Sequence, residues 1–439
     1  MLYSCILVKT LPEKRKSIVE LIKNLENVIE ILLLEYENYN ILILNRTQDF
    51  KSINEIVYKI DHIEGVVSSR ITLPWGEAWR PDAFAVLNDS RAMKKLGRYF
   101  SIVQDNKIAK VHIAKKIKAN FDENNSLDEL WGEHEKLINE FLLLEKEIDS
   151  NKKRFTYLKI LEKPDKSFLD LKIEISKRIL KNCILCSRRC NVNRATGNLG
   201  YCKCGTDVVV SSIYKHWGEE PDITPAGAIF TCGCTMKCLY CMNWKTSQWI
   251  KNGKIYSPKK LAKELEHLKR NGSRNAFLTG EPTPWLKQWL ETLKYLNINV
   301  PIVWNSNAYY SEETAKLLAG VIDLYVLDFK YGSNKCAERI SDAPNYWEAS
   351  TQNYLSAVKY GELLIRILIL PKHFECCTRP RLIWIAKYLG TNVRTYISLM
   401  YSPEWRANEI PELQNKLTKE DMEETINIIK ETGLKNIII

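Results

Sequence analysis

Residues 228–241 read Ala-Ile-Phe-Thr-Cys-Gly-Cys-Thr-Met-Lys-Cys-Leu-Tyr-Cys. The apolar residues at the start predict a buried strand, and three thiols, Cys234, Cys238 and Cys241, follow it directly. A 4Fe–4S cluster normally takes four cysteine ligands, so a loop that supplies three leaves one iron open to a substrate or cofactor. Two alternatives stay open, namely a zinc knuckle and a cluster whose fourth ligand is Cys232.

The composition is that of a soluble globular protein, with 439 residues, 45% of them hydrophobic and 27% charged. No apolar run approaches the roughly 20 residues of a membrane span, and residues 1–10 lack the layout of a signal peptide. We therefore expect a cytoplasmic protein with no membrane partner. The net charge of +11 suits RNA or an acidic protein as partner, or a lysine-rich surface that binds neither.

The cysteines indicate metal binding rather than disulfides, because nine of the 13 lie between Cys183 and Cys241 of a long chain. A second candidate metal site consists of Cys183, Cys186, Cys190 and Cys202. Four soft ligands suit structural zinc or an auxiliary iron–sulfur cluster. Cys204 is an alternative fourth ligand.

Residues 1–75 predict a ferredoxin-like domain with the order βαββαβ. Apolar runs predict four strands, at residues 5–8, 28–34, 41–44 and 65–67. Apolar residues at helical spacing predict helices at 18–25 and 53–60, and a polar turn is expected at 37–40.

Two short stretches of this domain, residues 6–10 and 63–67, resemble the ligand-binding domain of the leucine-responsive (feast/famine) regulators. The resemblance implies ligand sensing. Docking or dimerisation is the alternative role, since no DNA-reading helix accompanies the segment.

Residues 76–180 predict a mostly helical connecting region. Ser126 and Glu129 have the spacing of a capping box, and apolar residues at helical spacing after them predict a long amphipathic helix. His134 lies on the apolar face of that helix, where we expect a core residue rather than a ligand. Residues 181–206 form the four-cysteine segment.

From residue 207 to 439 the pattern changes to βα repeats, which predict an α/β domain with a parallel sheet covered by helices. Six strands are expected, at residues 228–231, 276–278, 302–304, 324–326, 364–370 and 395–399. Ser257 and Ser311 have the features of helix starts. Sites on parallel barrels gather at the carboxyl ends of the strands, so we expect a cavity there.

Chemically distinctive residues follow successive strands at this end. After the three cysteines come Gly280 and Glu281, then the run Asn305-Ser306-Asn307, then Asp328 and Lys330, while Arg366 lies within the next strand. The opposite charges of Asp328 and Lys330 make them candidate catalytic residues that orient a substrate. Alternatively, they form only a local ion pair.

The cysteine loop, the Gly280-Glu281-Pro282 turn and the βα repeats resemble the radical S-adenosylmethionine (radical SAM) superfamily. Residues 183–407 are similar to its subgroup of proteins related to pyruvate formate-lyase activating enzyme. The stretches that carry this similarity are residues 186–194, 217–221, 241–243, 328–332, 344–347 and 373–377. The resemblance implies a partial (β/α)6 barrel.

The resemblance also implies a 4Fe–4S cluster held by Cys234, Cys238 and Cys241, with S-adenosylmethionine chelating the open iron. Reduction by an external electron donor would then cleave the cofactor to a 5′-deoxyadenosyl radical, which abstracts hydrogen from an unknown substrate. A protein, an RNA and a small molecule are all open as that substrate.

Supporting roles follow from the same resemblance. It implies that Gly280 and Glu281 bind the methionyl ammonium. It also implies that Asn305 and Ser306 bind the ribose. Arg366 is implied to pair with the methionyl carboxylate. The sequence departs from the family pattern at Thr279, where a glycine is usual, so the turn is more restricted.

Two other functions stay open. The enzyme could install a glycyl radical on a partner protein, as an activase does. A different class is a metal- or metabolite-sensing regulator, which the N-terminal domain and the four-cysteine set suggest.

Overall fold

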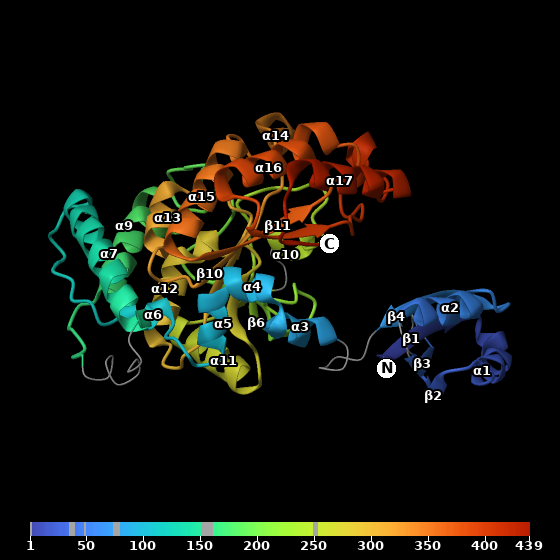
Figure 1. The fold of residues 1–439 in the computed structure, drawn as a ribbon. Coiled ribbons are helices and arrows are strands. Elements are labelled where there is room, and N and C mark those ends of the chain that lie inside the picture. Colours follow the sequence, from blue (N-terminus) through green and yellow to red (C-terminus); the bar gives the residue numbers. More distant parts are fainter. Residues whose placement is uncertain (1, 35–39, 48–49, 73–79, 151–160, 249–252) are drawn as a thin grey trace. The chain divides into compact units, whose positions relative to one another are not determined.

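The computed structural model describes residues 2–34, 40–47, 50–72, 80–150, 161–248 and 253–439. These residues divide into two units, Met1–Ala85 and Val86–Ile439, each of which is described by itself (Figure 1). The turn expected at 37–40 lies largely outside the described residues, as does the expected boundary at residue 75. Among the described residues, no helix combines the length and the apolar character needed to cross a membrane.

The first unit has the βαββαβ element order that its apolar pattern predicts. Its elements are β1 (Leu2–Thr10), α1 (Arg15–Lys23), β2 (Val28–Leu33), β3 (Ile41–Thr47), α2 (Phe50–Asp61), β4 (Val66–Thr72) and α3 (Pro81–Ala85). The sheet order is β2-β3-β1-β4, and every pair is antiparallel. Branched side chains such as Ile6, Ile18 and Ile43 form a core of its own.

The second unit begins with helices, in agreement with the helical region expected from the sequence. They are α4 (Ser90–Lys95), α5 (Gly97–Val103), α6 (Lys110–Ala114), α7 (Leu127–Ser150) and α9 (Phe168–Ile179). The capping box of α7 is confirmed, because the Ser126 N–H donates to Glu129 Oε2 (2.6 Å) and the Glu129 N–H to Ser126 Oγ (3.2 Å). His134 is buried and lies 2.8 Å from Lys172 Nζ, so it is a core residue as expected.

A nine-stranded sheet forms the centre of this unit, in the order β13-β12-β11-β10-β9-β8-β6-β5-β7. The strands are β5 (Val209–His216), β6 (Ala226–Thr231), β7 (Lys254–Ile255), β8 (Asn275–Thr279), β9 (Ile302–Ser306), β10 (Leu324–Asp328), β11 (Glu362–Leu368), β12 (Arg394–Ser398) and β13 (Ile437–Ile438). β6 and β8–β13 are parallel to one another, whereas β5 pairs antiparallel with both of its neighbours, β6 and β7. All six expected strands are present, and β5, β7 and β13 were not predicted.

Helices connect the parallel strands. They are α10 (Trp244–Ser247), α11 (Pro258–Arg270), α12 (Leu286–Tyr295), α13 (Glu312–Leu318), α14 (Asn334–Ser341), α15 (Tyr346–Tyr360), α16 (Arg379–Trp384) and α17 (Lys419–Thr432). Two predicted starts are confirmed, because Ser257 Oγ accepts from the Lys260 N–H (3.3 Å) and Ser311 Oγ from the Thr314 N–H (3.2 Å).

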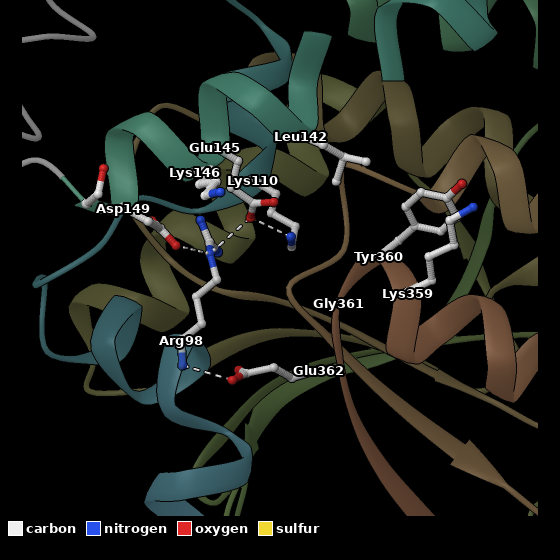
Figure 2. Close-up of a pocket in the computed structure, with 11 residues that line it drawn as sticks. Arg98, Lys110, Leu142, Glu145, Lys146, Asp149, Lys359, Tyr360, Gly361 and Glu362 are labelled. Carbon is white, nitrogen blue, oxygen red and sulfur yellow. Dashed lines mark hydrogen bonds and ion pairs between the residues drawn. The ribbon is translucent and has the colours of Figure 1, made fainter. Parts of the chain in front are cut away.

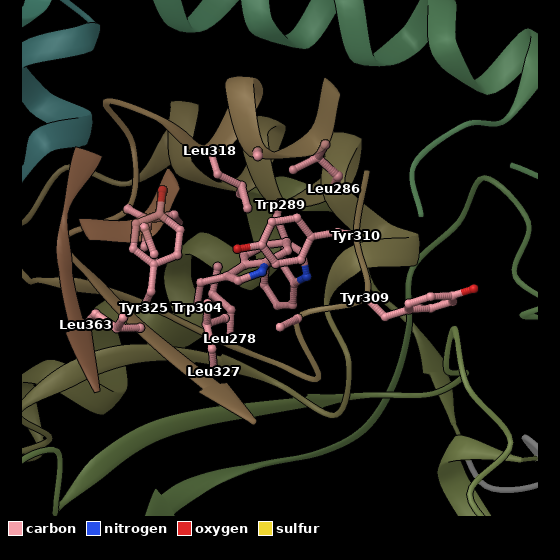
Figure 3. Close-up of a cluster of buried hydrophobic side chains, with 14 of the residues drawn as sticks. Leu278, Leu286, Trp289, Trp304, Tyr309, Tyr310, Leu318, Tyr325, Leu327 and Leu363 are labelled. Carbon is pink, nitrogen blue, oxygen red and sulfur yellow. The ribbon is translucent and has the colours of Figure 1, made fainter. Parts of the chain in front are cut away.

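Large apolar side chains cover the outer face of the sheet. Successive side chains of a strand point to opposite faces, so Leu278, Trp304 and Leu327 share this face. Figure 3 shows them among the rings of Trp289 and Tyr310, and all five are buried. This aromatic core fixes the strands against their covering helices.

The inner face is apolar at its amino half and polar at its carboxyl end. In the amino half, Phe277, Val303 and Leu364 pack in one cluster with Tyr99 and Phe100 of α5. The residues that follow on the same face, two positions along each strand, are Thr279, Asn305 and Arg366. The helices α4 and α5 therefore close the amino half of this face, and chemically active groups gather at the carboxyl end.

Candidate functional site

The loop that carries Cys234, Cys238 and Cys241 joins β6 to α10 at the carboxyl edge of the parallel strands. Backbone hydrogen bonds fix it, because the Lys237 N–H donates to Ser341 O (2.8 Å) and the Leu239 N–H donates to the carbonyl of the preceding residue of α14 (3.0 Å). The loop is thus tied to the end of α14 as well as to its own strand.

The three thiols are largely shielded from solvent, since Cys234 and Cys238 are buried and Cys241 is half-buried. Polar donors face two of the sulfurs: the Met236 N–H lies 3.4 Å from Cys234 Sγ, and Ser247 Oγ lies 3.1 Å from Cys241 Sγ. Burial raises the pKa of Cys238 to about 11 and also raises the pKa of the other two. Three sulfur donors on one loop suit an iron–sulfur cluster or another thiophilic metal centre.

The fourth thiol of the loop, that of Cys232, faces a different neighbour. A Cβ placed on Gly253 would lie 2.9 Å from Cys232 Sγ, at the edge of the sheet where β5 pairs with β7. This position gives no support to Cys232 as the fourth ligand of a cluster.

The turn after β8 brings Gly280 and Glu281 against the neighbouring strand ends. Gly280 has φ +90°, and a Cβ there would lie 2.3 Å from the carbonyl oxygen of Thr231, so only glycine fits this close approach. The buried Glu281 carboxylate accepts from Ser306 Oγ (3.0 Å) and from the Asn307 N–H (2.9 Å). Glu281 therefore ties the ends of β8 and β9 together, and burial raises its pKa.

Asn307 connects this turn to the cysteine loop. Its side-chain Nδ2 lies 3.6 Å from Cys234 Sγ and donates to Thr235 Oγ1 (3.1 Å), while its backbone binds Glu281. The sequence analysis placed Asn307 in the run Asn305-Ser306-Asn307 after the strand expected at residues 302–304 but gave it no role of its own.

Arg366, which is half-buried, lies at the centre of a charge network. Its Nε donates to Glu220 Oε1 (2.6 Å), its Nη2 donates to Glu219 Oε2 (2.6 Å), and its Nη1 lies 3.4 Å from Asn305 Oδ1. Asn305 Nδ2 in turn donates to Thr279 Oγ1 (2.6 Å). The structure thus places Arg366 beside Asn305, as expected, but also pairs it with two carboxylates.

Glu219 and Glu220 are site residues that the sequence analysis missed. Burial acts to raise both pKa values, but Arg366 and His216 hold the pKa of Glu219 below its usual range. The pKa of Glu220 is raised, because burial and the neighbouring Glu219 outweigh Arg366. The sequence feature that could have identified them is the pair of adjacent acidic residues directly before Pro221.

Asp328 and Lys330 form an ion pair with 2.7 Å between Lys330 Nζ and Asp328 Oδ2. The other oxygen, Asp328 Oδ1, is buried, makes no hydrogen bond among the described residues and lies 3.8 Å from Arg366 Nη1. Burial would lower the pKa of Lys330, but Asp328 outweighs it and raises that pKa well above its usual value. A buried acceptor atom that lacks a donor, such as Asp328 Oδ1 at the polar end of β10, is expected where a polar ligand binds.

The four-cysteine set gathers between α9 and β5. Burial, together with the nearby thiols of Cys183, Cys190 and Cys202, raises the pKa of Cys186 to about 12. A Cβ on Gly200 would lie 2.9 Å from Cys190 Sγ and 3.9 Å from Cys202 Sγ, so both sulfurs surround this glycine.

A buried cation accompanies this set, because Arg194 Nη1 lies 3.9 Å from Cys183 Sγ. A positive charge stabilises thiolates, so the donor set fits a metal site. Cys204 contacts both groups, with its Sγ 3.3 Å from the carbonyl oxygen of Cys202 and 3.9 Å from that of Cys232.

A pocket of about 530 Å³ lies at the opposite, amino edge of the sheet (Figure 2). Its walls hold an ion network in which Arg98 pairs with Glu145 (3.0 Å), Asp149 (3.0 Å) and Asp323 (2.9 Å). Residues at the amino edge of a barrel serve stability rather than catalysis. The network joins α5 and α7 to the start of β10, so we assign it a structural role.

The fold and the site together define an α/β protein with a sulfur-rich candidate metal centre at the carboxyl edge of a parallel sheet. The family model described as the radical SAM superfamily matches residues 228–380. A curated relative, the uncharacterized protein MJ0674 of Methanocaldococcus jannaschii, is 40% identical over 347 residues, which cover 77% of this chain and 98% of the relative. The chain belongs to the radical SAM superfamily. Membership implies radical chemistry that depends on S-adenosylmethionine and a 4Fe–4S cluster.

Solved structures show weaker similarity. Streptococcus suis SuiB bound to the precursor peptide SuiA is 14% identical over 46% of each chain, with a TM-score of 0.34. HydG, a maturase of the FeFe-hydrogenase, is 11% identical over 81% of this chain and 64% of its own, with a TM-score of 0.33. TTHA0845 of Thermus thermophilus is 22% identical over 18% of this chain and 100% of its own, with a TM-score of 0.17.

Proposed function

We propose that the protein is a radical SAM enzyme of the subgroup related to pyruvate formate-lyase activating enzyme, acting on a substrate that is still to be identified. The observation that carries the proposal is the loop after β6, which presents three shielded thiols beside the polar strand ends. Family membership supports the cofactor, and the loop supplies its ligands.

Cys234, Cys238 and Cys241 would hold the cluster. When bound, a reduced 4Fe–4S cluster supplies the electron that cleaves the sulfonium of S-adenosylmethionine to a 5′-deoxyadenosyl radical. Asn307 and the Met236 N–H point donors at Cys234 Sγ, and hydrogen bonds to cluster sulfurs tune the reduction potential.

The ends of β8 and β9 would hold S-adenosylmethionine. Gly280 lets the turn approach closely, and the negative charge of Glu281 favours the methionyl ammonium while its hydrogen bonds hold the turn in place. Asn305 and Ser306 would contact the ribose. Arg366 would present Nη1 to the methionyl carboxylate, because Nε and Nη2 already bind acids.

Asp328 and Lys330 are the proposed substrate-positioning pair. Asp328 Oδ1 accepts no hydrogen bond from the described residues, and Lys330 carries a positive charge. A polar group of the substrate could therefore bind to either side chain and replace the ion pair between them. The four-cysteine set around Cys186 is proposed to hold zinc or an auxiliary iron–sulfur cluster.

The finer fold assignment is also a proposal. We propose a partial (β/α)6 barrel over residues 207–439, with β13 added at its edge, after the connecting region 76–180 and the metal segment 181–206. The βαββαβ order supports a ferredoxin-like class for residues 1–75. Docking or dimerisation is the role we favour for that domain.

The test compares Cys238→Ala with Cys232→Ala in anaerobically reconstituted full-length protein. We expect the wild type and Cys232→Ala to hold the cluster and to release 5′-deoxyadenosine after dithionite reduction, and Cys238→Ala to do neither. Both residues are buried on the same loop, so Cys232→Ala controls for packing. If the wild-type protein binds iron but releases no 5′-deoxyadenosine, this result contradicts the proposed radical SAM activity and favours a metal- or metabolite-sensing regulator.

A further inference from the structure

A third group of metal-binding side chains lies beyond the polar strand ends, and the sequence analysis did not connect its members. Cys336 lies in α14, after β10, whereas His373, Cys376 and Cys377 lie in the turn after β11 that leads into α16. One sulfur or nitrogen atom from each of the four residues lies within 4.8 Å of all the others. Two separate loops therefore meet through four soft donor atoms.

The distances between these atoms fit the edges of a tetrahedral zinc site. The Sγ atoms of Cys336 and Cys376 are 3.7 Å apart. His373 Nδ1 lies 3.2, 3.7 and 4.0 Å from the sulfurs of Cys376, Cys336 and Cys377. Zn–S bonds of about 2.3 Å and Zn–N bonds of about 2.0 Å give tetrahedral edges of about 3.8 Å and 3.5 Å.

The short distances between these sulfur and nitrogen atoms argue against a 4Fe–4S cluster at this site. In a 4Fe–4S cluster each thiolate binds a different iron, so the sulfurs stand farther apart than around one ion. Three thiols with one imidazole are among the usual ligand sets of structural zinc.

The orientation of His373 is that of a metal ligand. Nδ1 faces the sulfurs, and the buried Nε2 lies 3.6 Å from Glu412 Oε1 with no hydrogen bond among the described residues. Glu412 is held in turn by an ion pair with Arg339. A carboxylate behind the distal ring nitrogen is the arrangement that orients zinc-binding histidines in proteins.

Cys336, His373 and Cys377 are buried, and Cys376 is exposed, so an ion could enter at Cys376. A buried cation lies next to the group, because Arg381 Nε donates to the carbonyl oxygen of Cys377 (2.9 Å). Its positive charge would offset the excess negative charge of three thiolates on one zinc ion.

We propose that Cys336, His373, Cys376 and Cys377 bind a zinc ion that ties the loop after β10 to the loop after β11. The two loops already touch, since a Cβ on Gly332 would lie 2.7 Å from the Cys377 carbonyl oxygen. The zinc ion therefore holds in place the segment that carries Lys330. This site is separate from the cluster and S-adenosylmethionine sites, so it stands whether or not the proposed function does.

The first test measures zinc and iron per chain by mass spectrometry in anaerobically purified full-length protein. We expect Cys336→Ser and His373→Ala each to contain one zinc fewer than the wild type, with iron unchanged. Cys5→Ser, at a half-buried cysteine of the first unit, should match the wild type. Equal zinc in all four proteins overturns the proposal, and iron reports on the cluster independently.

A second test avoids variants that fail to fold. An anomalous difference map from wild-type crystals, measured at the zinc edge, should show a peak bonded to the three sulfurs and to His373 Nδ1. A map without this peak, or a disulfide between Cys336 and Cys376, overturns the site. Glu412→Gln keeps all four ligands, so we expect it to retain zinc but to lose it to a chelator at 10–100-fold lower concentration.

Discussion

At the scale of single residues, Arg381 shows how the carboxyl edge depends on one buried side chain. Its guanidinium has no solvent exposure and donates to the carbonyl oxygens of Cys377 (2.9 Å), Lys330 (3.0 Å) and Phe329 (2.5 Å). These carbonyls belong to both loops that follow β10 and β11. Arg381 thus joins the segment of Asp328 and Lys330 to the segment of the proposed zinc ligands.

Replacing Arg381 with methionine should lower the free energy of unfolding by about 3 kcal/mol, because buried carbonyl groups lose their donors. Urea unfolding followed by circular dichroism measures this change. Arg379→Met is the matched control on the same helix, since Arg379 is partly exposed and pairs only with the exposed acids Glu375, Glu424 and Glu431 among the described residues. We expect the control to behave like the wild type, and similar losses in both variants would contradict the prediction.

Glu362 is a half-buried acid whose titration should appear in the stability of the protein. Its carboxylate accepts from the backbone N–H groups of Arg98 (2.9 Å) and Tyr99 (2.6 Å) at the pocket of Figure 2. Burial outweighs these hydrogen bonds and raises the pKa of Glu362 from 4.5 to about 7.

Because the folded state holds the Glu362 proton more tightly, it binds more protons than the unfolded state between about pH 4.5 and pH 7. Stability from this group is therefore complete below pH 4.5 and is lost as the pH rises through 7, by about 3 kcal/mol in total. Glu362→Gln cannot ionise and should remove this part of the pH dependence. Urea unfolding at pH 5 and pH 7.5 tests it, and the same difference in both proteins would refute the assignment.

At the scale of elements, the sequence predicted the six parallel strands that surround the site. All six have a short apolar run, and four of them are followed directly by chemically distinct residues, as β8 is by Gly280 and Glu281. β5 was missed because its side chains are mostly half-buried, next to the short edge strand β7, so its apolar pattern is weak. β13 has only two residues and is too short to produce a pattern.

The site could be predicted in part for a similar reason. Residues that follow strands in sequence, such as Cys234 and Asn305, were found because they lie next to a recognisable pattern. Glu219, Glu220 and the zinc-binding group were missed because their partners are far along the chain. Arg366 and Glu220 are 146 positions apart, and only the folded sheet brings them together.

The close approach between the turn after β8 and the end of β6 can be tested at Gly280. Gly280 and Gly272 have nearly equal φ angles of +90° and +86°, but a Cβ meets Thr231 only at Gly280 and meets nothing within 4 Å at Gly272. We expect Gly272→Ala to cost about 1 kcal/mol from backbone strain alone.

Gly280→Ala should cost at least about 3 kcal/mol, because a packed strand end must also move. It should further reduce the affinity for S-adenosylmethionine in the reconstituted protein. The free energies come from urea unfolding of both variants. Equal losses of unfolding free energy in Gly280→Ala and Gly272→Ala would show that the close approach of Gly280 to Thr231 does not contribute to stability.

At the scale of the whole molecule, the chain consists of two units with separate cores. Isoleucines such as Ile6 and Ile43 form the core of the first unit, and the aromatic and aliphatic cluster around Trp304 belongs to the second. Units with separate cores can unfold independently.

We therefore expect two transitions in calorimetry of the full-length protein. A fragment that starts at Val86 should keep one of them at the same temperature and should load iron as the full chain does. The reason is that the core and all proposed cluster ligands lie within that unit. A single cooperative transition, or a fragment without iron, would contradict this division.

The helices α4 and α5 close the amino half of the inner face of the sheet, and this limits the routes by which molecules can reach the polar strand ends. Phe100 and its neighbours fill the space between the strands and these helices, so the amino half of the inner face is closed to a ligand. We therefore expect S-adenosylmethionine and substrate to enter and leave at the carboxyl end of the strands. A protein that delivers electrons would then have to bind without covering that end.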